Sequence, residues 1–436
     1  MARAPTTYHM RLAGQGGGNR PVQIAALDVG SYKVTCIIAI AGERMEDHGP
    51  SIRVTGVGHQ MCQGLKNGVV VDVGATAMAI RAAVDNAEVM ARTQIDSVFV
   101  NVSCGDIRSH TVSVGVNVGG HRIGDADLSR VLRDAVAAAS TTDRQIIHSI
   151  PTGYTVDGHS GSRDPRGMFA SELGVNLHIV TASQGPVRNL VAAVHSASLG
   201  VDGLIATAYA SGMGVLSETE MDLGATLIDM GSGTTSIGVF YENCMLYTAT
   251  IPRGGAHVTS DLAYGLRTSL AEAERIKVRH GSAELIGNDG RKQVEYRQDG
   301  DDPNDPPYQI DASALPGFIG PRVEETLEAV YDTLKAAGLH RLAGQNIVLT
   351  GGASQLAGVD RLVDRIMGKS VRLAHRPVRL TNLPEIANQP GYATCGGLLS
   401  YAVRSPLEAL ELKDAADAAG GHSAFARFGQ WLKRAF

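Results

Sequence analysis

Several familiar features are missing from this 436-residue chain. It has no run of about 18 apolar residues, which argues against a transmembrane helix, and its first twenty residues lack the apolar centre of a signal peptide. Its five cysteines are scattered, without a C-x-x-C pair or a histidine at zinc-ligand spacing, which favours buried thiols in a reducing cytosol. With a net charge of −5, the chain has no general attraction for nucleic acid. We therefore expect a cytoplasmic protein without a nucleic-acid partner.

Two common nucleotide-binding motifs are also absent. No G-x-x-x-x-G-K-[S/T] segment occurs, which excludes a P-loop. The glycines at 231 and 233 lack the third glycine of a dinucleotide fingerprint, and residues 237–240 predict a strand where that fold requires a helix. Any nucleotide site must therefore be built in another way.

The most informative feature that is present is a duplicated segment. Residues 24–35 and 225–237, about 200 residues apart, each contain an apolar strand, the letters Asp-x-Gly-Ser and a second β-prone run. Each copy predicts a β-hairpin with a tight turn. A single copy is compatible with an ordinary turn beside a solvated aspartate, but the duplication argues against this. Such turns direct backbone N–H groups at an anion, and their carboxylates hold a hydrated divalent cation. Two facing copies predict a clamp for a nucleoside triphosphate.

The remaining sequence predicts several units. Strands alternate with helices over most of the chain, which is typical of an α/β fold, and the tail is poor in large apolar residues until its last dozen positions. We predict a disordered leader (1–20), a first α/β domain (21–96 and 177–220) with an inserted α+β subdomain (97–176), a second α/β domain (221–404) with a helical and loop subdomain at about 256–337, a flexible linker (405–423) and a terminal amphipathic helix (424–436). Within the subdomain we expect a long helix over 256–279, a surface loop or loose hairpin at 287–307 and a helix over 322–337.

Four motifs in order carry a resemblance to a known superfamily. They are the two hairpins, the strand and turn Ile347-Val348-Leu349-Thr350-Gly351-Gly352-Ala353-Ser354, and the later Tyr392-Ala393-Thr394-Cys395-Gly396-Gly397-Leu398. They resemble the phosphate-1, phosphate-2, adenosine and connecting motifs of the actin/Hsp70/sugar-kinase superfamily. The resemblance implies an actin-like ATPase fold, in which two duplicated α/β domains surround a nucleotide cleft.

Within this superfamily the chain resembles the bacterial cell-division family FtsA. The resemblance rests on Thr259-Ser260-Asp261-Leu262-Ala263-Tyr264-Gly265, on residues 271–281, on the inserted α+β unit and on a tethered amphipathic C-terminus, and it covers about residues 22–436.

The resemblance assigns roles residue by residue. It implies ATP and Mg²⁺ as ligands, with Asp28 and Asp229 holding the hydrated metal ion. It places Gly30, Ser31, Lys33, Gly231, Ser232, Gly233 and Thr234 at the phosphates. It places Glu274 and Lys277, which share one helix face, opposite Gly351, Gly352, Ala353 and Ser354 at the adenosine. Spacing alone favours an ordinary surface ion pair between Glu274 and Lys277, so their adenosine role rests on the resemblance.

The same resemblance bears on hydrolysis. In actin, a glutamine six residues before the tyrosine of a Tyr-Ala-Ser-Gly stretch orients the attacking water; here that stretch is 209–212, and counting back reaches Gly203. A glycine has no side chain with which to orient water. We therefore expect weak or no ATPase activity and a mainly structural protein, without a confidently assigned catalytic residue.

The last residues predict a membrane-surface helix. Large apolar side chains share one face and basic side chains lie on the other, which is typical of a helix at an anionic lipid surface. The residues concerned are Phe425, Arg427, Phe428, Trp431, Leu432, Lys433, Arg434 and Phe436. A helix that docks on the protein's own core is the alternative, but the polar linker before it argues against tight docking.

Together these features predict a membrane-tethering actin homologue. The resemblance implies that it polymerises with itself, links the FtsZ ring to the cytoplasmic face of the inner membrane at the division site, and contacts other membrane proteins of the division machinery. The alternatives are a small-molecule kinase of the same superfamily or a pilus-assembly relative. A kinase function would not explain the tethered amphipathic helix. The same helix argues against the pilus-assembly relative.

Overall fold

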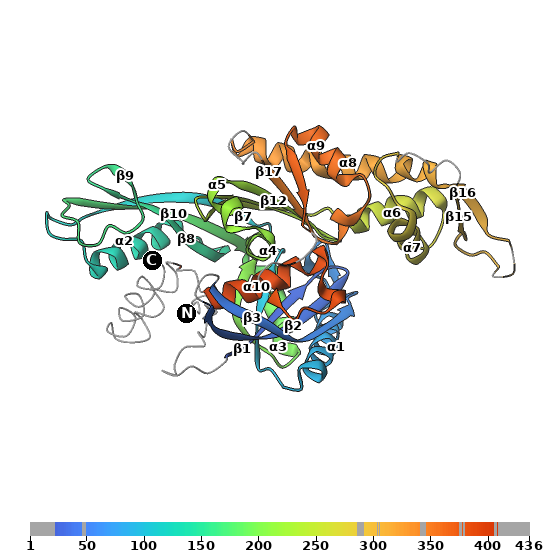
Figure 1. Ribbon diagram of the computed structural model, residues 1–436, viewed down its shortest axis with the longest axis horizontal. Helices are drawn as coiled ribbons and strands as arrows, with labels where there is room; N and C mark the ends of the chain where they lie inside the picture. The colour runs from blue at the N-terminus through green and yellow to red at the C-terminus, as the bar shows by residue number, and fades with distance from the viewer. Residues whose placement is uncertain are drawn as a thin grey trace.

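The computed structural model describes residues 22–45, 49–285, 292–302, 304, 306–340, 346–374, 377, 380–404 and 408. Two α/β domains form the centre, one above the other, while an insert projects at one end of the molecule and a helical subdomain at the other (Figure 1). The predicted leader, the terminal helix and the linker apart from Glu408 lie outside the described residues. In the described part, no helix is both long enough and apolar enough to cross a membrane.

The first domain is built on a six-stranded sheet. Its spatial order is β11-β6-β1-β2-β3-β19. The bounds are β1 (Val22–Val29), β2 (Lys33–Met45), β3 (Gly49–Met61), β6 (Ser97–Val102), β11 (Gly200–Ala206) and β19 (Leu380–Thr381). Helices α1 (Val73–Ala91) and α3 (Gln184–Ser196) pack together on one side of it, and α10 (Ala393–Arg404) contacts β1, β2 and β6. A short hairpin, β4 (Leu65–Lys66) and β5 (Val69–Val70), lies between β3 and α1 in the chain.

The second domain repeats this plan. Its sheet has the order β14-β13-β12-β17-β18. The bounds are β12 (Ala225–Met230), β13 (Thr235–Tyr241), β14 (Cys244–Ile251), β17 (Asn346–Thr350) and β18 (Ser370–Leu373). In both sheets an antiparallel meander is followed by two parallel strands, because β1 pairs with β2 and β6 as β12 pairs with β13 and β17. Helix α9 (Val359–Met367) covers one side, α4 (Thr207–Val215) contacts β12 and β13, and α5 (Glu218–Leu223) contacts β13.

The helical subdomain differs from its prediction in two helices, of which the one expected over 322–337 begins seven residues earlier, at Leu315. The helix expected over 256–279 is two helices, α6 (Gly255–Leu266) and α7 (Leu270–His280). The chain breaks at Arg267, which takes a left-handed conformation with φ of 54°, and Ser269 then caps α7 by accepting from the Glu272 N–H. Helix α8 (Leu315–Ala336) packs on α6, and β15 (Gln293–Tyr296) pairs with β16 (Tyr308–Asp311) in a two-stranded ribbon.

The insert is a four-stranded sheet with one helix on it. Its order is β7-β10-β8-β9, with β7 (Arg108–Asn117), β8 (Arg144–Val156), β9 (His159–Ser162) and β10 (Glu172–Ser183), and α2 (Asp125–Ala139) packs on β7 and β10. The predicted insert began with residues 97–102, but these form β6 of the six-stranded sheet, paired with β1 and β11. It was predicted to end at 176, whereas β10 stays paired with β8 as far as Ser183.

Helices α4 and α10 lie between the two sheets and cross at close range (Figure 1). A Cβ on Gly397 would lie 1.6 Å from the carbonyl oxygen of Ala210, and a Cβ on Gly214 would lie 2.3 Å from that of Ala393. Only glycine allows the two backbones to approach this closely. The two domains are therefore joined by a helix pair that tolerates no side chain at its crossing.

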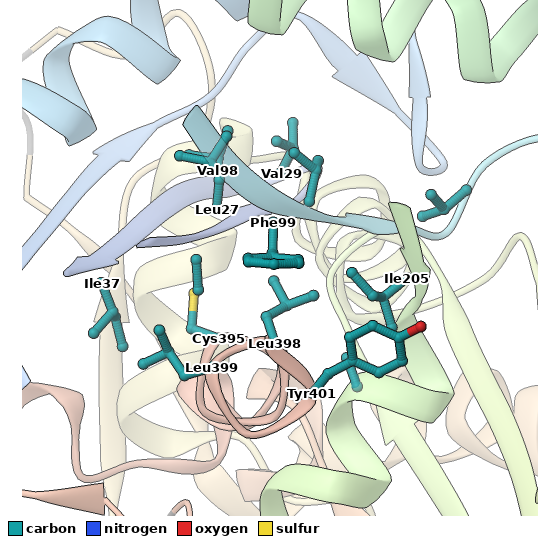
Figure 2. Close-up of a cluster of buried hydrophobic side chains, with 14 of the residues drawn as sticks. Leu27, Val29, Ile37, Val98, Phe99, Ile205, Cys395, Leu398, Leu399 and Tyr401 are labelled. Atoms are coloured by element: carbon teal, nitrogen blue, oxygen red, sulfur yellow. The ribbon is translucent and has the colours of Figure 1, made fainter. Parts of the chain in front are cut away.

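The other side of α10 closes the core of the first domain. Figure 2 shows Leu398 of α10 facing Phe99 of β6, with Cys395 and Tyr401 on either side. Leu398 and Leu399 are fully buried. Burial of such side chains contributes about 1.5–3 kcal/mol each, so α10 is held firmly against the first domain.

The crossing of α4 and α10 makes a stability prediction. We expect Gly397→Ala to lower the free energy of unfolding by about 3 kcal/mol or more, because the new methyl group overlaps the Ala210 carbonyl and must force the helices apart. Gly317→Ala in α8 is the control, because a Cβ there meets nothing within 4 Å. That control should be neutral or stabilise by up to about 1 kcal/mol. Urea denaturation measures both, and equal effects would contradict the close crossing.

Candidate functional site

The two predicted hairpins are present and have the same turn. The Gly30 N–H donates to the Lys33 carbonyl at 3.1 Å, and the Gly231 N–H donates to the Thr234 carbonyl at 2.9 Å. Each turn joins the first two strands of its own sheet, β1 to β2 and β12 to β13. The sequence duplication therefore corresponds to a duplicated structural element, with one copy in each domain.

The tips of the hairpins meet each other. A Cβ on Gly233 would lie 2.4 Å from the Ser31 hydroxyl oxygen, so a larger residue at 233 would collide with the opposite hairpin. The same hydroxyl accepts from the Gly68 N–H at 2.9 Å, and a Cβ on Gly68 would lie 2.9 Å from Thr234 Cγ2. The turn between β4 and β5 thus lies against both tips. Phosphate-site residues predicted from two distant segments lie together at this point.

The two aspartates follow at the base of the hairpins. The Asp229 side chain is buried and accepts from the Ser211 hydroxyl at 2.5 Å, with the Thr394 hydroxyl at 3.4 Å. Burial raises its pKa, while these hydroxyls oppose the rise. Burial likewise raises the pKa of Asp28 to about 7, helped by the charge of Asp229 and opposed by Lys33. Two carboxylates that repel each other in a poorly hydrated site would be stabilised by a nearby positive charge.

This donor set fits a hydrated divalent cation. Carboxylate oxygens are the ligands that Mg²⁺ prefers, and Mg²⁺ characteristically uses one or two of them while keeping several waters. No group of three or more acidic, histidine or cysteine side chains suited to a metal ion occurs in the described part of the chain. When bound, the cation would supply the charge that neutralises Asp28 and Asp229 and the phosphates beside them. The role predicted for the two aspartates therefore remains compatible with their surroundings.

Lys33 lies over an aromatic ring beside this site. Its ammonium nitrogen is 3.6 Å from the centre of the Tyr392 ring, a cation–π contact. Burial lowers its pKa, while Asp28 opposes this. Tyr392 belongs to a short 3₁₀ turn, Pro390–Tyr392, that leads into α10. The predicted phosphate residue Lys33 is therefore held at the start of the helix that links the domains.

The predicted adenosine residues also come together. Lys277 Nζ lies 2.7 Å from Glu274 Oε2, and it donates to the Thr259 hydroxyl at 2.8 Å and to the Gly255 carbonyl at 3.0 Å. A Cβ on Gly255 would lie 3.2 Å from the Cβ of Ala353. The α6–α7 pair therefore faces the turn after β17, which contains Gly351, Gly352, Ala353 and Ser354. Gly351 has φ of 86°, and a Cβ there would lie 2.3 Å from Asp229 Oδ1.

Several site residues were missed by reasoning from the sequence. Ser211 and Thr394 hydrogen-bond to Asp229, and Thr259 joins Glu274 to Lys277. Gly255 and Ala256 at the start of α6 donate their N–H groups to the carbonyls of Gly231 and Ser232, at 3.0 and 2.8 Å. Ser211, Thr259 and Thr394 all lie inside the motifs quoted above, so a search for hydroxyl residues within those motifs would have found them.

The structure places position 203 before the end of its strand. Gly203 lies within β11, where a Cβ would meet the Phe99 ring at 3.1 Å, and the strand runs on to Ala206. The residue at that end is Thr207, whose hydroxyl accepts from the Asn101 amide at 3.3 Å, while Asn101 Oδ1 accepts from the Val29 N–H at 2.8 Å.

The fold and the paired hairpins define the class of protein. The two domains have the same topology, and the tip of one hairpin from each domain meets the other. A subdomain is inserted in the first domain. This arrangement is an actin-like ATPase fold. A solved structure of this class, the PilM-PilN type IV pilus biogenesis complex, superposes with a TM-score of 0.58 over 88% of this chain and 99% of that chain, at 16% identity. This likeness shows the fold alone.

The sequence comparisons then identify the family. Residues 226–397 match the family Cell division protein FtsA, and residues 104–181 match the SHS2 domain inserted in FtsA. The chain is 41% identical to the cell division protein FtsA of Rhizobium meliloti over 95% of each chain, and 31% identical to that of Escherichia coli K12 over 95% of this chain and 98% of the relative. This chain belongs to the FtsA family of cell division proteins.

The paired carboxylates lead to a pH prediction. Because the pKa of Asp28 is about 7 in the folded protein against 3.8 for an ordinary aspartate, the folded protein binds more protons than the unfolded chain between these pH values, and stability falls as pH rises through this range. Asp28→Asn removes the titrating group and with it this loss of stability. The free energy of unfolding of the variant minus that of the unsubstituted protein should therefore increase by about 2–3 kcal/mol from pH 5 to pH 8, measured by denaturation without nucleotide or metal.

The matched control is Asp85→Asn, which changes an exposed carboxylate on α1. Its effect on stability should stay constant over the same pH range. If Asp28→Asn behaved like Asp85→Asn, the raised pKa that burial and the charge of Asp229 give to Asp28 would be contradicted.

Proposed function

We propose that this protein binds ATP with Mg²⁺ between its two hairpins and uses the nucleotide to set the relative position of its two domains. The single observation that supports this most directly is the meeting of Asp28 and Asp229, one from each domain, beside the contacting tips of the hairpins. A ligand that binds both hairpins contacts both domains at once. Its binding energy is therefore available to hold the domains in one arrangement.

The proposed contacts follow the geometry of the site. Asp28 and Asp229 hold the hydrated metal ion, and Lys33 moves from the Tyr392 ring to a phosphate. The turn residues of the two hairpins surround the phosphates: Gly30, Ser31, Gly231, Ser232, Gly233 and Thr234. Glu274 and Lys277 contact the ribose and base on one side, opposite the turn of residues 351–354.

We propose that hydrolysis is slow and that ATP acts mainly as a conformational ligand. Asn101, an amide side chain near the first hairpin, is already engaged at both ends, with the Val29 N–H and with Thr207. An amide held in this way is not free to orient water for attack. A purified-protein turnover rate as high as that of an efficient kinase would contradict this proposal.

At the cellular level, we propose that the protein polymerises on the cytoplasmic face of the inner membrane and tethers the FtsZ ring there, together with other membrane proteins of the division machinery. Membership of a cell-division family supports this role. The amphipathic pattern of residues 425–436 supplies the membrane contact. One such helix binds reversibly, because ordering it offsets much of the gain from apolar burial, whereas a polymer that carries many helices binds persistently.

The FtsZ contact is proposed on the helical subdomain at about 256–337. Its helices α6 and α7 expose large apolar side chains, with Tyr264 at 89%, Val278 at 72% and Leu270 at 62% exposure. Exposed apolar groups of this size are typical of protein-binding surfaces. This subdomain also lies at the far end of the molecule from the insert (Figure 1), so a partner bound there leaves the insert accessible.

A substitution at the adenosine side tests nucleotide binding. Lys277→Met removes the ammonium group beside Glu274 but keeps the length of the side chain, and we expect it to weaken ATP binding about tenfold through loss of a charged hydrogen bond. Arg279→Met is the control, because it removes an exposed cation from the same helix. Calorimetry with Mg²⁺ and ATP measures both variants. Equal affinities for the two would contradict an adenosine role for Lys277.

A second prediction concerns the terminal helix. Trp431→Asp puts a charge on its apolar face, and co-sedimentation with anionic liposomes should fall at least about tenfold, because large apolar burial is replaced by repulsion from the headgroups. Gln430→Asp makes the same change in charge on the polar face and should reduce binding only slightly. Recruitment of FtsZ to the liposomes should follow lipid binding in both variants. Similar losses for the two variants would mean that charge alone governs attachment.

A further inference from the structure

Glu408 is buried although it lies in a stretch whose composition predicts a flexible linker. Only 4% of its surface is exposed. Its carboxylate accepts three hydrogen bonds, from His148 Nδ1 at 2.6 Å, from the Ser149 N–H at 2.8 Å and from the Tyr401 hydroxyl at 2.7 Å. A buried carboxylate is costly unless it is paired in this way. The site is therefore a built receptor for one acidic side chain.

The protonation state of His148 follows from its two partners. The Ala206 N–H donates to His148 Nε2 at 2.9 Å, so this nitrogen bears no proton and the proton lies on Nδ1, which faces Glu408. His148 is thus a neutral donor to an anionic Glu408. Burial favours the protonated acid, but the donors on His148, Tyr401 and Ser149 stabilise the carboxylate.

The receptor joins three parts of the molecule. His148 and Ser149 belong to β8 of the insert, Ala206 ends β11 of the first domain, and Tyr401 belongs to α10. The Tyr209 ring of α4 packs edge-on against His148, with ring centres 5.0 Å apart, and against Tyr401 at 5.8 Å. We call the part of β8 that contains His148 and Ser149 the root of the insert. Glu408 therefore lies where this root meets α4 and α10, the two helices that link the domains.

We infer that Glu408 is an anchor that fixes the C-terminal segment to the root of the insert, so that the free linker begins after residue 408 and not at the end of α10. A force applied to the chain after Glu408 is then transmitted to the insert and to α10 together. The idea that the membrane exerts this force rests on the proposed function. The anchor itself rests only on the contacts of Glu408. Beyond the anchor, 15 residues of the linker predicted from composition remain, 409–423, and a flexible chain of that length spans about 19–23 Å.

Limited proteolysis tests the anchor. Trypsin can cleave after Arg404, which ends α10, or after Lys413, beyond the anchor. In the unsubstituted full-length protein, cleavage after Lys413 should be fast and cleavage after Arg404 slow, because anchoring at both sides restrains the 404–405 bond. Glu408→Ala should make the two sites comparable, with mass spectrometry identifying the products. Glu411→Ala, which removes a neighbouring carboxylate from the same segment, should leave the original pattern.

Hydrogen exchange gives a second, independent measurement. The Ser149 amide should exchange at least about tenfold faster in Glu408→Ala than in the unsubstituted protein, since its acceptor is lost. Tyr401→Phe, which removes one donor and keeps the ring, should show a smaller increase and guards against misfolding of the first variant. Unchanged exchange at Ser149 together with unchanged cleavage after Arg404 would overturn the inference.

The anchor and the membrane function fail in different ways. Glu408→Ala should keep its binding to anionic liposomes while losing protection after Arg404. Trp431→Asp should lose liposome binding while keeping that protection. Loss of protection in Trp431→Asp would show that the terminal helix, and not Glu408, holds the segment in place, and would overturn the anchor.

Discussion

The structure depends on one buried carboxylate, that of Asp229. It ends the first strand of the second domain, and its partners come from the two helices between the domains, Ser211 of α4 and Thr394 of α10. The third neighbour is Gly351 of the adenosine turn, where any Cβ would collide with the carboxylate. A buried charge must be satisfied by nearby donors, and the donors to Asp229 come from the two helices between the domains. The position of Asp229 therefore constrains α4, α10 and the turn after β17 together.

The two domains contribute equivalent elements to this central region. Each domain contributes a hairpin with the same turn hydrogen bond, and each contributes one helix to the crossing at Gly214 and Gly397. The crossing is a contact of backbones at its two glycines. Side chains beside it also join the helices, because the Ser211 and Thr394 hydroxyls lie 3.0 Å apart and the Tyr209 and Tyr401 rings pack edge-on with centres 5.8 Å apart. The relative position of α4 and α10 is thus set by both backbone and side-chain contacts.

The local parts of this arrangement could be predicted from the sequence. Both hairpins follow from strand patterns and glycine-bearing turns, and the strand before Gly351 follows from its apolar run. That the charge of Asp229 acts on Asp28 could be inferred only from the duplication of the two segments and from the resemblance, because no pattern within either segment alone points to the other. The hydroxyl partners of Asp229 were missed since Ser211 and Thr394 lie in helices that the sequence places far apart.

The failures have specific physical causes. Residues 97–102 read as a strand in any sheet, and only pairing with β1 and β11 assigns them to the first domain. The break at Arg267 lacks the glycine that usually announces a left-handed helix end. Counting back from Tyr209 identified Gly203 but not its place within the strand, which runs on to Ala206. Glu408 was missed because composition averages over a segment, whereas one side chain with three donors is enough to order its position.

Glu408 also lies at the start of two short chains of contacts that lead to the clamp. Through Tyr401 it meets α10, and seven residues earlier, on the same face of that helix, Thr394 contacts Asp229. Through His148 it meets Ala206, whose neighbour Thr207 bonds Asn101, which in turn accepts from Val29 beside Asp28. One chain ends at each hairpin. The contacts of Glu408 are therefore connected, through these side chains and backbone groups, to the bases of both hairpins.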